Sequence, residues 1–223
     1  METVSRLSHF PMYQVFEDFC KICSCSLHNA YKDNPIMAKS CYRDLYESRE
    51  NEYLKVVGKY KKEVFNEYFP LMLANLTSLL LQEPKDYLGT IFEKLNLSQH
   101  FNGQFFTPPH ICEFMAEITL GNEVENAIKE KGYFSMAEPA CGSGAMVIGL
   151  VRCMKNRGYD NLGGKIYIEA TDIDALCVNM TYTQLSLLGL SVRVIHGNSL
   201  TMETFNTWDS PNLQVAKMAG YFN

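Results

Sequence analysis

The residues best suited to chemistry lie in an acidic, glycine-rich segment at 136–144, which reads Met-Ala-Glu-Pro-Ala-Cys-Gly-Ser-Gly. Gly142 and Gly144 let the backbone bend tightly and approach a ligand without Cβ atoms in the way. The first amides of the helix that follows are expected to stay free to donate hydrogen bonds. The segment, which we call the glycine corner, therefore predicts a pocket for a small ligand. A dinucleotide site would usually have a third glycine where this chain has Val147, which disfavours that ligand.

A second acidic segment, at 169–174, supplies a carboxylate to the same pocket. Asp172 falls at the tip of a predicted strand, where a carboxylate points into the crevice beside the glycine turn and can accept both hydroxyls of a ribose. The alternative role for these acids is to cap the next helix or to complement its dipole, and Asp174 fits that role well. We therefore expect Asp172 to contact the ligand.

Composition predicts a soluble globular protein. A chain of 223 residues that is 47% hydrophobic can bury a sizeable core. Its net charge of −5 gives no overall basic surface, so any DNA contact must be local or shared with a partner. No segment resembles a targeting sequence or a membrane span, and the eight cysteines are expected to be reduced thiols. We expect a cytoplasmic protein without membrane contact.

Two kinds of pattern meet near residue 100. Residues 10–97 carry apolar side chains at helical spacing, which predicts an all-helical N-terminal domain over 1–100. From 133 onward strands and helices alternate, which predicts a parallel sheet with crossover helices in a second domain over 101–223. The predicted strands are 133–137, 165–170 and 192–195, and the predicted helices are 145–155 and 175–188.

A further helix is predicted to begin at two prolines ahead of the glycine corner. Pro108 and Pro109 suit the first positions of a helix, and Thr107 suits its N-cap. Of the adjacent Phe105 and Phe106, we expect one to pack in the core. The helix would carry an apolar stripe of Ile111, Phe114, Met115 and Ile118.

Three motifs follow one another in a fixed order. Asp86-Tyr87-Leu88-Gly89 precedes Gly-Gln-Phe-Phe-Thr-Pro at 103–108, and the glycine corner follows. This order resembles that of the adenine-N6 DNA methyltransferases typified by the modification subunit of type I restriction systems, with Glu138 where the family has Asp. The resemblance covers about residues 86–200. It implies an α/β fold: a Rossmann-like S-adenosylmethionine-dependent methyltransferase core, shortened, after the helical N-terminal domain.

The resemblance also implies a site for S-adenosylmethionine, with DNA as the partner. In that site the segment 106–108 flanks the methionine end, the corner surrounds the ammonium and carboxylate groups, and Asp172 binds the ribose. The cofactor carries a sulfonium and an ammonium but no phosphate, so carboxylates complement it. The implied cofactor-binding residues are Phe106, Thr107, Pro108, Glu138, Ala140, Gly142, Gly144, Asp172 and Asn198.

The chain departs from the family at two places. The family's Gly-Asp-x-Leu, whose Asp contacts the cofactor's adenine amine, is Gly-Asn-Ser-Leu at 197–200, and Asn198 can accept that hydrogen bond only without charge. The family's catalytic Asn/Asp-Pro-Pro-aromatic motif, which accepts the amine hydrogens and stacks on a flipped adenine, is not found. Residues 209–212, Asp-Ser-Pro-Asn, are disfavoured as a remnant because no strand-like run precedes them and no aromatic residue follows Pro211. The catalytic residues are therefore unassigned.

Only three strands of the usual seven are predicted, which leaves the first strand at an open edge of the sheet. The tail at 205–223, a second copy of the chain or a partner subunit would cover that edge, and a homodimer is favoured because symmetric dimers are the commonest assemblies.

Two local clusters have simpler explanations than a site. Cys20, Cys23, Cys25 and His28 have a spacing that favours buried positions on a helix over a zinc site. Residues 55–62 hold four lysines that could meet phosphates, and a solvated helix face is favoured.

Three functions are compatible with these residues. The first is a methyltransferase acting on adenine in DNA. The second is a cofactor-binding or interaction protein without catalytic activity that modulates restriction and modification, which the missing motif favours. The third, a small-molecule methyltransferase, is disfavoured by the segment at 103–108.

Overall fold

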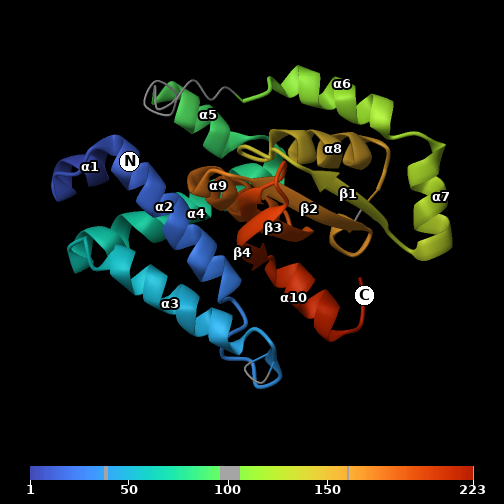
Figure 1. The fold of residues 1–223 in the computed structure, drawn as a ribbon. Helices are drawn as coiled ribbons and strands as arrows, with labels where there is room; N and C mark the ends of the chain where they lie inside the picture. The colour runs from blue at the N-terminus through green and yellow to red at the C-terminus, as the bar shows by residue number, and fades with distance from the viewer. Residues whose placement is uncertain (38–39, 96–105, 160, 223) are drawn as a thin grey trace.

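The computed structural model describes residues 1–37, 40–95, 106–159 and 161–222, and within them helices surround one sheet (Figure 1). The N-terminal part is helical, as predicted. Its helices are α1 (Glu2–Ser8), α2 (Met12–His28), α3 (Arg43–Val57), α4 (Lys62–Gln82) and α5 (Tyr87–Lys94). The predicted boundary at residue 100 lies outside the described residues and stays a prediction.

The C-terminal part alternates strands and helices. Its elements are α6 (Pro109–Thr119), α7 (Asn122–Lys131), β1 (Phe134–Glu138), α8 (Ala145–Asn156), the short 3₁₀-helix η3 (Leu162–Gly164), β2 (Ile166–Asp172), α9 (Ala175–Leu187), β3 (Ser191–Asn198), β4 (Glu203–Asp209) and α10 (Pro211–Met218). The predicted strand–helix alternation from 133 to 195 is confirmed within a few residues at each boundary.

The sheet has the order β1-β2-β3-β4, with β1, β2 and β3 parallel and β4 antiparallel to β3. The parallel strands with crossover helices were predicted, whereas β4 was not. In β4 the two large apolar side chains, Phe205 and Trp208, are three residues apart, so they fall on opposite faces of the strand. The segment therefore lacks the period-two pattern that marks a half-buried strand.

The core lies between one face of the sheet and the crossover helices. Ile166, Ile168 and Ala170 alternate along β2 as fully buried residues and join buried side chains of α8 and α9 in one apolar cluster. The other face is less covered, because Ser135 and Ala137 of β1 are exposed. No strand among the described residues pairs with the outer edge of β1.

The N-terminal helices pack against the sheet part through buried polar contacts. Ser24 on α2 donates a hydrogen bond to the carbonyl of Asn179 on α9 at 3.1 Å. The buried guanidinium of Arg49 on α3 lies 3.5 Å from the centre of the Trp208 ring. It also donates to the Asn206 side chain at 2.6 Å and to the Thr207 carbonyl at 3.1 Å, which fixes α3 against β4.

The lysine cluster is not a single helix face, which corrects the sequence analysis. Helix α3 ends at Val57, and Lys59 and Lys61 lie in the break before α4. Lys59 forms an ion pair with Asp18 at 2.7 Å, so part of its charge is already neutralised.

The cysteines of α2 are buried, as predicted. Cys20, Cys23 and Cys25 lie on one continuous helix with the buried His28. Among the described residues, no group of His, Cys, Asp and Glu side chains has the arrangement of a metal site. Across the same residues, no helix combines the length and apolar character needed to cross a membrane.

Candidate functional site

The carboxyl ends of β1 and β2 border a cavity of about 160 Å³. Three segments that are far apart in the sequence meet there: the entry to α6, the glycine corner, and the turn from β2 into α9. The lining residues are Phe106, Thr107, Ala140, Cys141, Gly142, Ser143, Ala145, Met146, Asp172 and Cys177. The structure thus brings together five of the predicted site residues: Phe106, Thr107, Ala140, Gly142 and Asp172.

The glycine corner has the backbone conformation that its sequence predicts. Gly142 has a φ of 53° and Gly144 a φ of 91°, both in the left-handed region that favours glycine. A Cβ at 142 would lie 3.0 Å from the Phe106 ring, so glycine leaves room for that ring beside the turn. Gly144 is the N-cap of α8 and no side chain caps this helix, which leaves its first amides available to a ligand.

Asp172 is held by backbone amides from two segments, the glycine corner and the turn into α9. Its Oδ2 accepts a hydrogen bond from Gly142 N–H at 2.8 Å, and its Oδ1 accepts one from Asp174 N–H at 2.9 Å. Burial raises the pKa of this carboxyl, and the backbone donors oppose that effect. Each oxygen keeps a lone pair, so the carboxylate can still accept the hydroxyls of a ligand.

Asp174 is the cap of α9, as predicted. Its Oδ1 accepts from Leu176 N–H at 2.7 Å and from Cys177 N–H at 3.2 Å. The two acids of the segment therefore differ in role, because only Asp172 lines the cavity.

Thr107 is not the N-cap of α6, which corrects the sequence analysis. The helix begins at Pro109, Pro108 occupies the cap, and no side chain caps the first turn. Pro109 has no N–H to satisfy, and Pro108 already has the extended conformation that a cap needs. Thr107 lines the cavity instead.

Phe106 connects the cavity to α5. Its ring lies 5.3 Å from that of Phe92, and its N–H donates to the Glu93 side chain at 3.2 Å. Phe105, the other candidate for core packing, lies outside the described residues. The apolar stripe predicted on α6 is exposed rather than packed, because Cys112 and Ala116 form the face that meets α8. The stripe consists of Ile111, Phe114, Met115 and Ile118.

Four predicted site residues do not line the cavity: Pro108, Glu138, Gly144 and Asn198. Glu138 accepts from Ala140 N–H at 3.2 Å and so supports the corner. Asn198 ends β3, and its Oδ1 accepts from Leu200 N–H at 3.0 Å and from Thr201 N–H at 3.3 Å. Its amide oxygen is therefore already engaged in the turn into β4.

Five residues that line the cavity were not predicted as site residues: Cys141, Ser143, Ala145, Met146 and Cys177. Cys177 lies one turn into the helix that Asp174 caps, a spacing that could have indicated it. Burial raises the pKa of the Cys141 thiol to about 12, so this side chain stays neutral. Ile173, the next residue in the sequence after Asp172, does not line the cavity, and its side chain is 61% exposed.

Residues 209–212 lie away from the cavity. A strand does precede them, contrary to the sequence analysis, but it runs antiparallel and pairs Asp209 with Arg193, whereas Asp172 pairs with His196. Burial raises the pKa of Asp209, but hydrogen bonds from Arg193 at 2.8 Å and Lys217 at 2.8 Å outweigh it, and the net shift is downward. Asp209 is thus a structural carboxylate.

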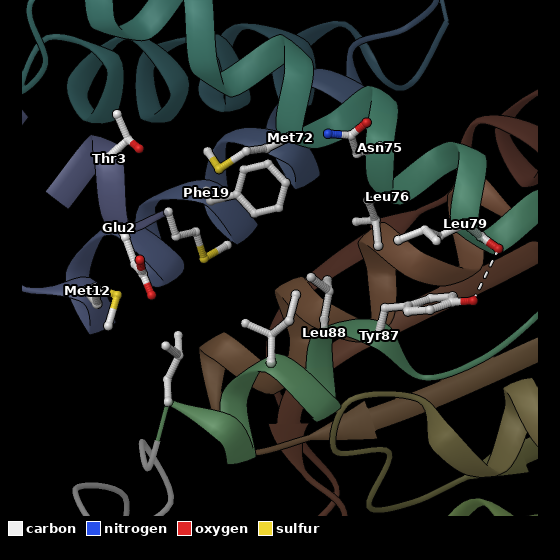
Figure 2. Close-up of a pocket in the computed structure, with 13 residues that line it drawn as sticks. Glu2, Thr3, Met12, Phe19, Met72, Asn75, Leu76, Leu79, Tyr87 and Leu88 are labelled. Atoms are coloured by element: carbon white, nitrogen blue, oxygen red, sulfur yellow. Dashed lines mark hydrogen bonds between the residues drawn. The ribbon is translucent and has the colours of Figure 1, made fainter.

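A larger cavity, of about 530 Å³, lies among α1, α2, α4 and α5 (Figure 2). Most of its walls are apolar side chains, including Phe19, Leu76 and Leu88. Its polar side chains are few, and the Tyr87 hydroxyl already donates to backbone carbonyls at 3.4 Å and 3.2 Å. The smaller cavity, at the carboxyl ends of β1 and β2, is the better candidate site, because a carboxylate and free helix amides lie together there.

Comparisons with known proteins find one family model and one solved structure that are similar to this chain. The family model described as N-6 DNA methylase matches residues 83–219, more than half of the chain. A solved structure from Listeria monocytogenes, assigned to the class I S-adenosylmethionine-dependent methyltransferases, is similar at 12% identity with a TM-score of 0.35. The similarity covers 83% of this chain and 54% of that one, so the chain spans about half of its length. A comparison with curated proteins gives no match.

Proposed function

The chain belongs to the N-6 DNA methylase family and has a Rossmann-like methyltransferase core, so we propose that the cavity at the carboxyl ends of β1 and β2 binds S-adenosylmethionine. We further propose that the protein serves adenine-N6 methylation of DNA. The observation that carries this proposal is Asp172. Its carboxylate accepts from the Gly142 amide at the end of β2, beside uncapped helix amides. That pairing suits a ligand with both ribose hydroxyls and a carboxylate of its own.

The residues present fit this cofactor. The carboxylates of Glu138 and Asp172 complement a cationic sulfonium, and the corner leaves a turn without Cβ atoms against Phe106. The cavity of about 160 Å³ is smaller than typical ligand pockets of about 300–1,000 Å³, so it would hold the methionine end while the nucleoside extends out of the cavity past Asp172. When bound, the cofactor supplies the methyl group. The residues proposed to hold it are Phe106, Thr107, Pro108, Glu138, Ala140, Gly142, Gly144, Asp172 and Asn198. Asn198 would have to release one of the two turn amides, Leu200 N–H or Thr201 N–H, to accept from the cofactor.

Titration calorimetry with S-adenosylmethionine tests this site, with Asp172→Asn as the variant. An amide leaves one backbone N–H without its acceptor and removes the charge from the hydroxyl contacts, so we expect affinity to fall about 10- to 100-fold. Asp174→Asn is the matched control, because asparagine also caps helices, and its affinity should stay within about threefold of wild type. A wild-type protein whose melting temperature does not rise with saturating cofactor would refute the proposal.

A cofactor-binding protein without methyl transfer, which modulates restriction and modification, is the second candidate. The position of Asp209 favours it. Residues 209–212 are the segment of this chain that most resembles the family's catalytic Asn/Asp-Pro-Pro-aromatic motif. Asp209 pairs with Arg193 at the end of β3 that lies away from the cavity, and it forms ion pairs with Arg193 and Lys217. A methyl-transfer assay on unmethylated duplex DNA, run beside the calorimetry, separates the two candidates. Turnover supports the enzyme, and binding without turnover supports the second function.

A second copy of the chain is the partner that we propose for the outer edge of β1. Phe134 N–H donates to the Lys165 carbonyl at 2.9 Å, toward β2, so the backbone groups of Ser135 and Ala137 point away from the sheet. Both side chains are small and exposed, which allows another strand to approach. Antiparallel pairing of two β1 strands across a twofold axis would satisfy these groups reciprocally.

A further inference from the structure

Asp86 carries a buried carboxylate that reaches the glycine corner from a distant part of the sequence. It caps α5 by accepting from Gly89 N–H at 2.8 Å, and its Oδ2 accepts from the Ser143 hydroxyl at 2.5 Å. Both Asp86 and Ser143 are buried. The start of α5 and the corner are therefore joined by a direct side-chain contact.

Gln184 on α9 holds this contact from a third side. Its Nε2 donates to Asp86 Oδ1 at 2.9 Å and to the Ser143 carbonyl at 2.8 Å. Its Oε1 accepts from Tyr87 N–H at 2.9 Å and from Leu88 N–H at 3.1 Å. The Gln184 carboxamide is fully buried and connects α5 to the glycine corner: its nitrogen donates to both, and its oxygen accepts from α5.

Gly89 makes this arrangement possible. A Cβ at this position would overlap the Asp86 carboxylate and lie 2.6 Å from Ser143 Oγ. The Asp-Tyr-Leu-Gly motif at 86–89 therefore combines a capping carboxylate, Asp86, with a glycine whose lack of a Cβ leaves room for the Ser143 hydroxyl. This gives the motif a physical reason that its sequence alone did not supply.

We propose that Asp86 is a positioning residue for the cofactor site: through Ser143 and with Gln184, it holds the glycine corner in the conformation that meets the ligand. This inference rests on the proposed function. Asp86 does not line the cavity, whereas Ser143 does, so the effect of Asp86 on binding is transmitted through that hydroxyl. Without the contact, the corner loses its anchor on α5.

The test compares Asp86→Ala and Asp86→Asn by calorimetry with S-adenosylmethionine and by melting without ligand. We expect the alanine variant to bind at least tenfold more weakly. The asparagine variant should recover most of the affinity, because its Oδ1 can accept from Gly89 and Gln184 while its amide donates to Ser143 Oγ. Thr90→Ala is the control, since this hydroxyl also lies on α5 but donates to the main-chain carbonyl of Asp86, at 2.6 Å, and not to its carboxylate. Its affinity should not change.

A double-mutant cycle with Ser143→Ala decides whether the effect passes through this residue. We expect Asp86→Ala with Ser143→Ala to bind no more weakly than Asp86→Ala alone, because both remove the same contact. Additive losses would overturn the inference, as would a folded Asp86→Ala protein that binds like wild type. If Asp86→Ala does not fold, unchanged affinity of Ser143→Ala overturns it. A wild-type protein that binds no cofactor overturns the proposed function and this inference together.

Discussion

At the scale of single residues, His28 couples folding to pH. Burial lowers its pKa to about 4 against an ordinary value near 6.5, although a hydrogen bond with Asn29 at 3.2 Å acts in the opposite direction. As the pH falls below 6.5, the unfolded chain takes up a proton that the folded chain does not. The native state therefore loses stability over that interval, by ~2 kcal/mol between pH 7 and pH 5.

Urea denaturation at pH 7 and pH 5 measures this loss. His28→Phe keeps an aromatic ring beside Trp208 but cannot be protonated, so its stability should fall less over the same interval. The expected result is the difference between the two proteins, whatever the variant does to stability at pH 7. Equal losses in both proteins would show that another group is responsible.

Gly142 offers a second residue-scale prediction. Gly142→Ala places a side chain at positive φ, which costs about 1 kcal/mol, and brings a Cβ to 3.0 Å from the Phe106 ring. We expect reduced stability together with at least tenfold weaker cofactor binding. Gly158→Ala is the matched control, because Gly158 also has positive φ but has no atom within 4 Å of an added Cβ. It should lose stability and keep its affinity, as calorimetry and urea denaturation would report.

At the scale of elements, Arg49 connects α3 to β4. Lysine at this position cannot present a planar fork to Asn206 and Thr207 or stack as well on Trp208, so Arg49→Lys should lose about 2 kcal/mol of stability. Arg43→Lys is the control, because Arg43 lies on the same helix and is exposed. The urea midpoints of the two variants should differ clearly. Similar midpoints would mean that the contact with β4 contributes little.

The sequence predicted elements where one pattern dominates. The alternating strands and helices from 133 to 195 were predicted because buried apolar residues alternate along β2 and β3 and because the glycines of the corner mark the turn between β1 and α8. Strand β4 was missed because its apolar residues face both ways, and the cap of α6 was misplaced because two prolines replace a capping side chain.

The candidate site was predictable only in part for a similar reason. Motifs adjacent in the sequence, at 106–107 and 140–142, together with the strand-end carboxylate Asp172, could be assigned to one cavity. The contact between Asp86 and Ser143 joins residues that are 57 positions apart and also involves Gln184 on α9, so no local sequence pattern predicts it. Hydrogen bonds between such distant segments can be identified only in the folded structure.

At the scale of the whole molecule, the exposed edge of β1 predicts a dimer. Ala137→Pro removes an N–H that points away from β2, so it should abolish association while leaving the pairing with β2 intact. Light scattering after size exclusion should then give the mass of one chain, against two for wild type and for the control Ala137→Ser. A wild-type monomer at micromolar concentration would contradict the dimer.

The contact between α3 and β4 has a consequence for growth of the sheet. Arg49 occupies the Thr207 carbonyl at the strand opposite β1, so the two borders of the sheet are not equivalent. Once two copies have paired through β1, the remaining sheet edges are the two β4 strands, and α3 packs against each of them. Polymerisation into fibres would therefore stop at two copies.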